Sequence, residues 1–420
     1  MKLKLKLKYI VIALLLVVVN SCIEEVEATP ELDSISAASD ILVVDARLTD
    51  ELKRHQVELS RIFPLDSDEP VFESGAQIVI VDDLGDRLDF VETSAGIYTS
   101  SQVFAAQQNR SYQLEITLTN GEKYTSTTVP MPASVPIGEL EAKRMLNDSE
   151  EEGVGVFVDN SANGDQPTFF RYEYEETYKI IAPNWDPFRL RVVRYAPCFP
   201  DPFVVETIPW EDERRICYGS NKSQRIIQAS SDDLNENTIN NFQLHFISRD
   251  NYIISHRYSM NVTQFALTSD AYSFYERLDS FSSSDNLFSQ VQPGFLEGNI
   301  TLESNPEKQA LGFFEVSSIS KKRMYFNYED LFPGEELPPY PVICGIMGNP
   351  RLWPRGYHCA SEGVCDGNCD SPLIEQILAE TVVYAQEKEG DGLSPYYTWP
   401  SPCGDCTKLG SNVVPDFWEE

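Results

Sequence analysis

The fold class of this chain can be read from YQLEITLTNGEKYTSTTV, residues 112–129. Its first half alternates apolar with polar side chains, as a strand with one buried face does. Asn120-Gly121 follows and is the strongest short-range signal for a two-residue hairpin turn. A second strand is expected from Lys123 to Val129. The stretch therefore predicts an antiparallel β-hairpin.

Short strands of the same kind precede this hairpin. They are separated by turn residues and show no helical period, which is typical of a small β-sandwich. Three prolines after the hairpin mark the end of this domain, which we place at residues 40–132. The preceding strands are expected at Ile41–Val44, His55–Ile62, Gln77–Val81 and Gly96–Tyr98.

Residues 137–420 are predicted to form a larger β-rich domain. Its clearest strand spans residues 170–180 and alternates aromatic with polar side chains, which indicates a half-buried sheet strand. Residues 242–246 and 257–263 repeat the pattern. One face of the first strand carries Phe170, Tyr172, Tyr174, Tyr178 and Ile180, and the other carries Arg171, Glu173, Glu175, Thr177 and Lys179.

Two helices are expected in this second region. The first begins after Thr268, a good N-cap, and has an apolar stripe at helical spacing. The stripe consists of Ala271, Phe274, Tyr275 and Leu278. The second begins at Pro372 with Ser371 as its cap. The chain is thus predicted to be mainly β, with one or two helices.

The N-terminus has the composition of a secretory signal. Four lysines precede an apolar run, Tyr9–Val19, that is about half the length needed to span a bilayer. Val19-Asn20-Ser21-Cys22 resembles a loose lipobox, in which residues 1–21 would be removed and Cys22 would carry acyl chains. An ordinary secretory signal with an incidental cysteine is the alternative. We expect a lipid anchor to a membrane.

Residues 22–39 are small, polar and acidic, and we interpret them as a tether. Glu24, Glu25 and Glu27 follow the lipidation site and resemble the signal that exports Bacteroidota lipoproteins to the outer face of the outer membrane. A solvated linker without such a role is the alternative. The predicted location is the outer membrane, lipid-anchored and exposed at the cell surface.

Charge narrows the range of partners. The chain has 66 acidic and 33 basic residues, for a formal net charge of −33. Such a surface repels the phosphates of nucleic acids, so we exclude nucleic acid as a partner. With 42% hydrophobic residues the chain is well above a disordered composition.

The cysteines other than Cys22 are eight, an even number that favours disulfides in an oxidising compartment. Four bridges are expected, and Cys198 with Cys217 would close a loop across a Pro-rich excursion. Zinc is the alternative for the C-terminal group, since Cys403-Gly-Asp-Cys406 has ligand spacing and His358 adjoins Cys359. The disulfide candidates are Cys198, Cys217, Cys344, Cys359, Cys365, Cys369, Cys403 and Cys406.

Two long excursions, residues 182–223 and 332–372, are rich in proline and aromatic residues and contain or adjoin most of these cysteines. Long loops without a core stay mobile unless they are pinned, so disulfide-stapled loops could hold a shaped binding surface. Loops tied down only against proteolysis are the alternative. The candidate contact residues are Trp185, Phe188, Phe203, Trp210, Tyr340, Trp353 and Tyr357.

No catalytic motif is present. The sequence lacks a Gly-x-Ser-x-Gly elbow, a His-Glu-x-x-His pair and a P-loop. Its histidines are His55, His245, His256 and His358. Asp366-Gly-Asn368-Cys-Asp370 opens like a calcium loop but lacks the glycine and the final acid of an EF-hand. We predict no catalytic residue, no metal site and no cofactor, with calcium in another geometry as the alternative.

Several short segments, in order, resemble a Bacteroidota lipoprotein family, the domain of unknown function 4249. The resemblance runs from about Leu42 to Trp418. Its marks are Val43–Asp45, Ser74–Ala76, Gly96–Tyr98, Tyr112–Tyr124, Arg257–Ser259, Ala271–Tyr275, Gly298–Ile300, Leu311–Phe314, Cys403–Cys406 and Pro415–Trp418.

This resemblance implies an immunoglobulin- or transthyretin-like first domain and a TonB-dependent, SusC-like transporter as partner. It supplies no catalytic residue and no substrate. We therefore expect a non-enzymatic surface lipoprotein that assists such a transporter and contacts a small ligand of unknown identity. A structural or assembly component of the envelope is the first alternative, and a surface hydrolase is the second.

Overall fold

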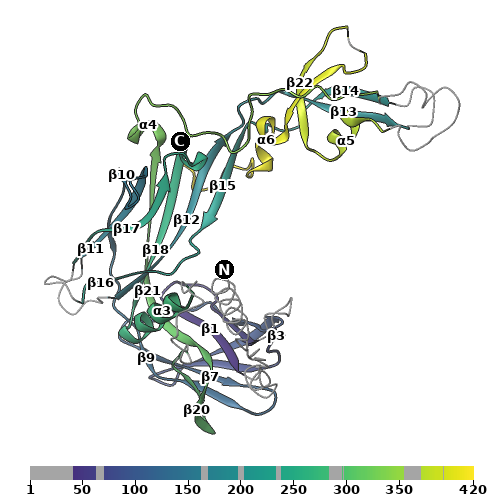
Figure 1. Cartoon of the computed structure of the whole chain (residues 1–420). Coiled ribbons are helices and arrows are strands. Elements are labelled where there is room, and N and C mark those ends of the chain that lie inside the picture. The colour runs from purple at the N-terminus through teal and green to yellow at the C-terminus, as the bar shows by residue number, and fades with distance from the viewer. Residues whose placement is uncertain are drawn as a thin grey trace, which may run out of the picture.

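The computed structural model describes residues 41–62, 71–161, 169–196, 203–232, 238–282, 296, 298–353, 370–390 and 392–420. Strands far outnumber helices in these residues, which confirms the prediction of a mainly β chain. The elements form three units in a bent arrangement (Figure 1). We call them the first domain, the second domain and the arm. No helix within these ranges is long and apolar enough to cross a membrane.

The first domain is one sheet that curls around a single core. Its strands follow the order β1-β2-β6-β5-β4-β7-β8-β19-β20, with β3 and β9 at the side. Tyr98, Tyr112 and Leu114 lie in its core, each at most 1% exposed. The bounds are β1 (Leu42–Thr49), β2 (Gln56–Arg61), β3 (Val71–Phe72), β4 (Gln77–Asp82), β5 (Arg87–Ser94), β6 (Ile97–Ser100), β7 (Ser111–Thr117), β8 (Lys123–Ser126), β9 (Val129–Pro130), β19 (Ile300–Leu302) and β20 (Asn305–Gln309).

The predicted hairpin is confirmed as β7 and β8, which pair antiparallel with Ile116 opposite Tyr124. Its turn has three residues and not the expected two, because the Leu118 backbone donates to the Glu122 carbonyl at 2.9 Å. Gly121 adopts a φ of +88°, the left-handed conformation that glycine tolerates best. The Asn120 side chain accepts a hydrogen bond from the Glu122 backbone, 2.9 Å long. Local turn chemistry therefore fixes the register of this hairpin.

Strand β21 (Leu311–Asn327) joins the first two domains. Its first residues pair parallel with β1, from Val43 opposite Leu311 to Thr49 opposite Ser317. The remainder pairs antiparallel with β18 (Arg257–Leu267) of the second domain. Residues 300–317 thus complete the first sheet, although we expected this domain to end at residue 132. Parallel pairing between such distant segments leaves no local sequence pattern.

The second domain is built from two facing sheets. Their apolar faces meet in one core, where Val156 of one sheet and Tyr172 and Met260 of the other are at most 1% exposed. Strands β10 (Ile137–Leu146), β11 (Glu152–Ser161) and β17 (Thr238–Ser248) form one sheet. The other contains β12 (Phe169–Ile181), β15 (Ile216–Lys222), β16 (Ile227–Ser230), β18 and the second half of β21, with η1 (Tyr252–Ile254) and α4 (Tyr328–Leu331) nearby.

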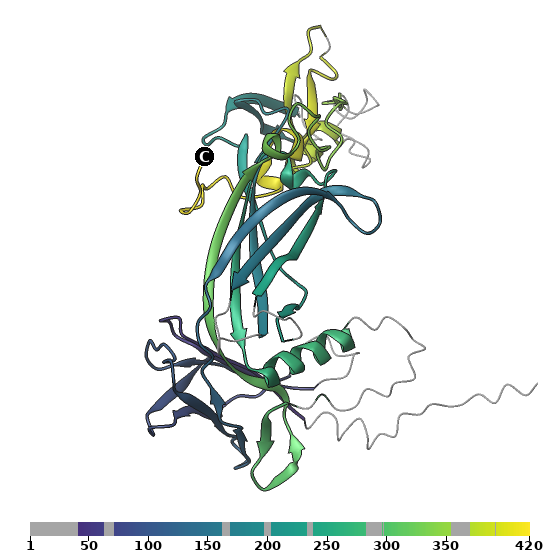
Figure 2. The same ribbon diagram turned by 90° about the vertical axis from the view of Figure 1, so that its left-hand side faces the viewer.

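Helix α3 (Ser269–Ser282) lies at the junction of the two domains (Figure 2). The Thr268 hydroxyl accepts a hydrogen bond from the Ala271 backbone, 3.3 Å long, which confirms the predicted N-cap. Phe274 packs on Phe313 of β21, with 5.2 Å between ring centroids. The predicted apolar stripe therefore faces the strand that connects the domains.

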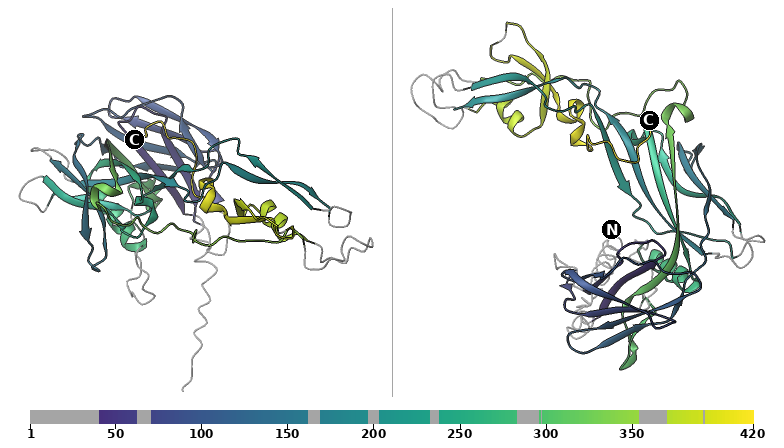
Figure 3. Two further views of the ribbon diagram at one scale, coloured as in Figure 1. Left: turned by 90° about the horizontal axis from the view of Figure 1, so that it is seen from above. Right: turned by 180° about the vertical axis from the view of Figure 1, so that it is seen from behind.

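The arm consists of residues 184–214 and 341–405 as far as they are described, and it projects from the second domain (Figure 3). Its core contains Leu190, Phe203, Leu352, Leu373 and Ile374. Its elements are β13 (Phe188–Tyr195), β14 (Phe203–Pro209), α5 (Pro372–Leu378), β22 (Val382–Glu387), β23 (Tyr396–Pro400) and α6 (Ser401–Gly404), with η2 (Cys406–Lys408) at its base.

The prediction of a long loop without a core was wrong for the first excursion, residues 182–223, which forms the hairpin of β13 and β14. The described part of the second excursion has no strand or helix before α5, but its Leu352 packs with Leu190 and Phe203 of the first excursion. Neither piece could form such a core alone, so the pattern within either one resembles a loop. The helix expected at Pro372 is confirmed as α5, whose Ile374 backbone donates to the Ser371 hydroxyl at 3.3 Å.

Two disulfides hold the base of the arm. Cys217 pairs with Cys406 across a sequence separation of 189, and Cys344 pairs with Cys403 across 59. The expected disulfide between Cys198 and Cys217 is therefore wrong, because Cys217 is bonded to Cys406. Cys403 and Cys406 each belong to a disulfide, which removes them as a zinc pair. Cys198, Cys359, Cys365, Cys369 and His358 lie outside the described residues.

The C-terminal segment, residues 411–420, lies on the outer face of the second domain. The Trp418 ring contacts Tyr218 at 4.9 Å between centroids, and the Arg323 guanidinium lies 3.6 Å from the centre of the Phe417 ring. Lys179 forms an ion pair with Glu420 at 2.8 Å. This segment covers the part of the outer face nearest the arm.

Candidate binding site

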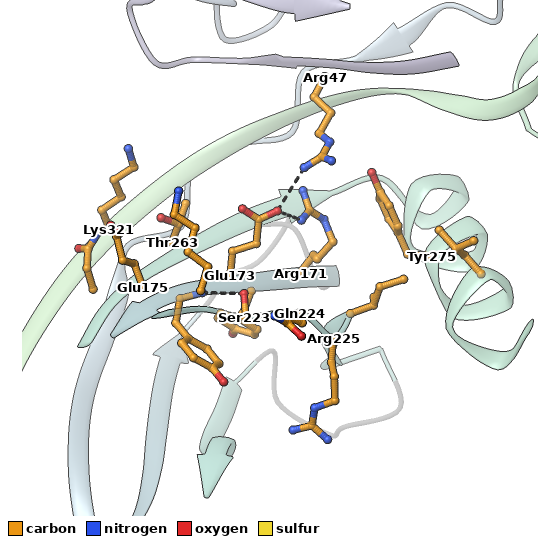
Figure 4. A pocket seen from close by; sticks show the side chains of 16 residues that line it. Arg47, Arg171, Glu173, Glu175, Ser223, Gln224, Arg225, Thr263, Tyr275 and Lys321 are labelled. Atoms are coloured by element: carbon orange, nitrogen blue, oxygen red, sulfur yellow. Dashed lines mark hydrogen bonds and ion pairs between the residues drawn. The ribbon is translucent and has the colours of Figure 1, made fainter. Parts of the chain in front are cut away.

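A pocket of about 460 Å³ opens where the outer face of the second domain meets the first domain (Figure 4). This volume is in the range of pockets that hold small molecules. Strands β12 and β18 form its floor, and β1, β21, α3 and the loop after β15 form its walls. The lining residues are Arg47, Arg171, Tyr172, Glu173, Tyr174, Glu175, Lys222, Ser223, Gln224, Arg225, Ile226, Asn261, Thr263, Tyr275, Leu278 and Lys321.

The floor of this pocket is ordered in two rows by strand register. In the first row, Lys222, Glu175 and Asn261 are direct neighbours on β15, β12 and β18. In the second, Glu173, Thr263 and Lys321 are neighbours on β12, β18 and β21. Directly opposed residues of antiparallel strands share one face of the sheet. Cationic, anionic and neutral polar groups therefore alternate across the floor.

An ion network, buried at Arg171 and Glu315 and open to solvent at Arg47 and Glu173, forms the wall between the domains. The Arg171 guanidinium lies 3.3 Å from the Glu315 carboxylate, and it also pairs with Glu173. Arg47 of the first domain reaches the same Glu173 oxygen at 3.2 Å (Figure 4). The Ser317 hydroxyl donates to Glu315 at 2.6 Å. The contacts in this wall therefore hold the two domains together.

Electrostatics keep Glu315 charged although it is fully buried. Burial raises the pKa of its carboxyl, but attraction to Arg171 and hydrogen bonds from Ser317 and Tyr275 outweigh burial and lower the pKa below 4.5. The Arg171 guanidinium also stacks over Phe265, at 4.2 Å from the ring centre. A charged pair in this setting fixes the geometry of the pocket wall.

Other lining groups are free to contact a ligand. In the described parts of the chain, no side-chain hydrogen bond or ion pair is made by Glu175, Lys222, Arg225, Asn261 or Thr263. Lys222 and Arg225 are exposed, whereas the other three are half-buried on the floor. These groups are hydrogen-bond donors and acceptors, so the pocket is equipped to bind a polar molecule.

The loop after β15, which begins next to Lys222 and carries Arg225, is held in place by reciprocal hydrogen bonds. The Ser223 backbone donates to the Tyr174 carbonyl at 2.9 Å, and the Tyr174 backbone donates to the Ser223 hydroxyl at 3.1 Å. β12 pairs with β15 before this loop and with β16 after it. The loop therefore crosses the edge of the floor in a defined position.

The predicted aromatic contact residues mostly pack inside the protein. Phe203 is buried and meets the Trp353 ring at 5.3 Å between centroids. Trp185 and Tyr340 pack against the core of the second domain. The Trp210 ring lies under the Arg214 guanidinium, 4.4 Å from its centre. Phe188 is 44% exposed, and Tyr357 lies outside the described residues.

Exposed apolar residues do gather on the arm, in a segment that we call the apolar segment, Ile343–Met347. Ile343 is 77% exposed, Ile346 72% and Met347 41%. The disulfide of Cys344 fixes this segment, and the Asn184 side chain donates to the Cys344 carbonyl at 2.7 Å. The sequence does not reveal the exposure of this segment, because its residues lie in an irregular stretch where no periodicity distinguishes buried from exposed positions.

Several other predicted site residues cannot be placed. Cys22, Glu24, Glu25 and Glu27 lie outside the described residues, as do Asp366 and Asn368 of the calcium-like motif. Within the described ranges, no group of three or more His, Cys, Asp or Glu side chains could hold a metal ion. Lipidation and export therefore stay predictions.

Two solved structures show a distant similarity to this chain. A DUF4785 family protein from Legionella pneumophila is similar at 10% identity and a TM-score of 0.17, covering 53% of this chain and 51% of that one. The B domain of a biofilm associated protein is similar at 8% identity and a TM-score of 0.13, covering 69% of this chain and 88% of that domain. This chain thus spans about half the length of the Legionella protein.

A search among curated proteins finds no match to this chain. A family match does exist, and it covers residues 25–323, well over half of the sequence. It takes in the first domain and every lining residue of the pocket. It ends before Cys403–Trp418, a region that also contributed to the sequence resemblance. The chain therefore belongs to the family described as domain of unknown function DUF4249.

Proposed function

We propose that this protein is a non-enzymatic lipoprotein of the outer membrane, anchored at the cell surface through Cys22. Its role would be to assist a TonB-dependent, SusC-like transporter in nutrient binding or uptake. The observation that carries this proposal is the apolar segment Ile343–Met347, which is exposed on the projecting arm and fixed by a disulfide. The arm would be the part that contacts the transporter.

Exposed apolar side chains at a fixed position favour docking. Exposed isoleucine and methionine side chains gain free energy when a partner removes them from water. A segment already held by the Cys344–Cys403 bridge loses little conformational entropy on binding, so more of that free energy appears as affinity. The arm also stands away from the rest of the protein, which leaves room for a partner (Figure 3).

The lipid anchor would add to this affinity. A tethered protein meets a transporter in the same membrane at a raised effective concentration. A modest apolar contact would then suffice for a stable complex. Replacing Cys22 by serine should release the protein from the membrane fraction without altering its circular dichroism spectrum. A variant that stays with the membranes would remove the anchor from the proposal.

The decisive experiment is a pull-down of the tagged, lipidated protein from outer membranes in mild detergent. We expect a stoichiometric transporter with the wild type and a clear loss of it with Ile343→Ser/Ile346→Ser. The matched control is Leu52→Ser/Leu84→Ser in the first domain, whose leucines are 73% and 74% exposed. This control should retain the transporter.

Other outcomes of the pull-down would favour a different contact surface or a different function. Equal transporter recovery with the arm variant would rule out the apolar segment as the contact. Recovery of other envelope proteins without a transporter would favour a structural or assembly role. A protein that comes out alone and turns over polysaccharide or peptide would instead be a surface hydrolase.

A further inference from the structure

We propose that the pocket between the first and second domains binds a neutral, hydroxyl-rich ligand, and we commit to an oligosaccharide. This inference deepens the proposed uptake role by naming a ligand class. Binding at the pocket can be measured without any transporter, so the two proposals can fail separately. The inference rests on the order of charges across the pocket floor and on which of those charges lack a partner.

The floor offers no region of a single sign. Lys222 is the cross-strand neighbour of Glu175, which is in turn the neighbour of Asn261. In the adjacent row, Glu173 and Lys321 flank Thr263. Opposed residues of adjacent strands lie only about 5 Å apart, so each charge is close to one of opposite sign or to a neutral group.

This alternation disfavours ionic ligands. An anion drawn to Lys222 would come close to Glu175, and it would also approach a protein of net charge −33. A cation drawn to Glu175 would meet Lys222 and the exposed Arg225 in the same way. The charged lining groups without a hydrogen bond or ion pair among the described residues are thus Lys222, Arg225 and Glu175, so an ion of either sign meets at least one group of its own sign.

A neutral ligand with many hydroxyl groups does not meet this conflict. Each hydroxyl can donate one hydrogen bond and accept two, so it can satisfy a carboxylate, an ammonium group or an amide alike. Glu175, Lys222, Asn261 and Thr263 provide these partners without breaking a contact made among the described residues. Hydrogen bonds to charged groups are also stronger than neutral ones.

The pocket is also formed before a ligand arrives. Its wall is held by the ion pairs of Arg171 and Arg47, and its edge is held by the hydrogen bonds between Ser223 and Tyr174. A preformed polar site spends little free energy on ordering its own side chains. The opening of about 460 Å³ leaves space for a few sugar units.

The test is isothermal titration calorimetry of the full-length protein in a detergent without a sugar headgroup. The neutral probes are maltohexaose, xylohexaose and mannohexaose, and the ionic comparators are the anion hexagalacturonate and the zwitterion trialanine. We expect at least one neutral hexasaccharide to bind with one site per chain. Its Kd should change less than about twofold from low to high salt, because no ion pair with the ligand is screened.

Matched variants locate the binding. Asn261→Ala and Glu175→Ala should each weaken binding about tenfold or more, which corresponds to about 1.4 kcal/mol. Glu139→Ala, an exposed carboxylate on the edge strand β10, should leave the Kd unchanged. The proposal is overturned if no neutral probe binds, if hexagalacturonate or trialanine binds more tightly, or if both floor variants bind like the wild type.

Discussion

Arg171 of β12 and Glu315 of β21 form an ion pair of 3.3 Å that is almost closed to solvent, with side chains 6% and 0% exposed. The pair lies where β21 passes from the first domain into the second. Glu315 is still the partner of Arg47 in the parallel pairing with β1, and Ser318 already pairs with β18. A charged contact therefore stands at the connection between the two domains.

Removing the Glu315 carboxylate should destabilise the protein strongly. In Glu315→Gln the Arg171 guanidinium stays buried but loses its main counter-charge, an arrangement that typically costs about 3 to 5 kcal/mol. The free energy of unfolding from urea denaturation, followed by tryptophan fluorescence, would measure this loss. A loss below about 1 kcal/mol would show that the pair does not hold the junction.

The double variant Arg171→Met/Glu315→Leu provides the control. It removes both charges and replaces them with apolar side chains, so no unpaired charge is left in the core. We expect it to be more stable than Glu315→Gln. A double variant at least as unstable as the single one would instead assign the loss to altered packing against Phe265 and Tyr275.

Stability should fall as the medium becomes acidic. Burial lowers the pKa of His55, His245 and His256 below 6.5, so the unfolded chain binds protons that the folded chain does not. Stability therefore rises with pH in this range and is lost as the pH falls below about 6.5. Below about 4.5 the lowered pKa of Glu315 adds a second loss, since its contribution disappears once it is protonated.

Melting temperatures at a series of pH values test this expectation. The wild type should melt at a lower temperature at ~pH 5 than at ~pH 7. His55 is 1% exposed, and its Nε2 lies 3.0 Å from the Phe104 carbonyl. His55→Gln should lower stability at neutral pH and flatten the first part of the pH dependence. A slope that is identical in this variant would assign the effect to other groups.

Gly312 should not tolerate a side chain. It has a φ of +127°, and a Cβ built there would lie 1.9 Å from the Val44 carbonyl oxygen. That oxygen belongs to β1, where the parallel pairing with β21 begins. Gly312→Ala should therefore disrupt the pairing that joins the domains and lower stability by about 3 kcal/mol or more.

The matched control for this variant is Gly345→Ala. No atom lies within 4 Å of a Cβ built at Gly345, and its φ is not positive. This variant should melt within about 2 °C of the wild type, since it removes backbone freedom without a clash. If Gly312→Ala melted at the same temperature as Gly345→Ala, the Val44 carbonyl would not approach residue 312 closely enough to exclude a side chain.

The features that sequence predicted correctly are local ones. The hairpin at residues 112–129 depends on alternation and an Asn-Gly turn, and α3 depends on a cap and an apolar stripe. The two faces of β12 were also predicted, because alternation within one strand assigns each side chain to a face. Each of these signals lies within about 20 residues of sequence.

The features that sequence did not predict depend on distant partners. The polar face of β12 becomes a pocket floor only because β15 and β18 lie beside it and Arg47 comes from another domain. Cys217 meets Cys406 across a separation of 189 residues, which cysteine spacing cannot reveal. The core of the arm likewise combines side chains of both excursions with Leu373 and Ile374 of α5, which lie far apart in the sequence.

The Cys344–Cys403 bridge should control the arm more than the whole protein. It closes 59 residues of sequence separation and holds the apolar segment next to α6. Cys344→Ser/Cys403→Ser should loosen this segment, because a disulfide of this span typically contributes about 2 to 4 kcal/mol by restricting the unfolded chain. The buried cores of the first two domains contain neither Cys344 nor Cys403, so they should be little affected.

Limited proteolysis and the pull-down together measure this effect. Cleavage near residues 337–350 should be several-fold faster in the double variant, and transporter recovery should fall with it, while the far-ultraviolet spectrum stays close to that of the wild type. Conservative loss of the other bridge, Cys217→Ala/Cys406→Ala, should instead expose cleavage sites at the base of the arm around η2. If the Cys344 variant resisted protease as the wild type does, the apolar segment would be held by its packing and its hydrogen bond from Asn184 rather than by the bridge.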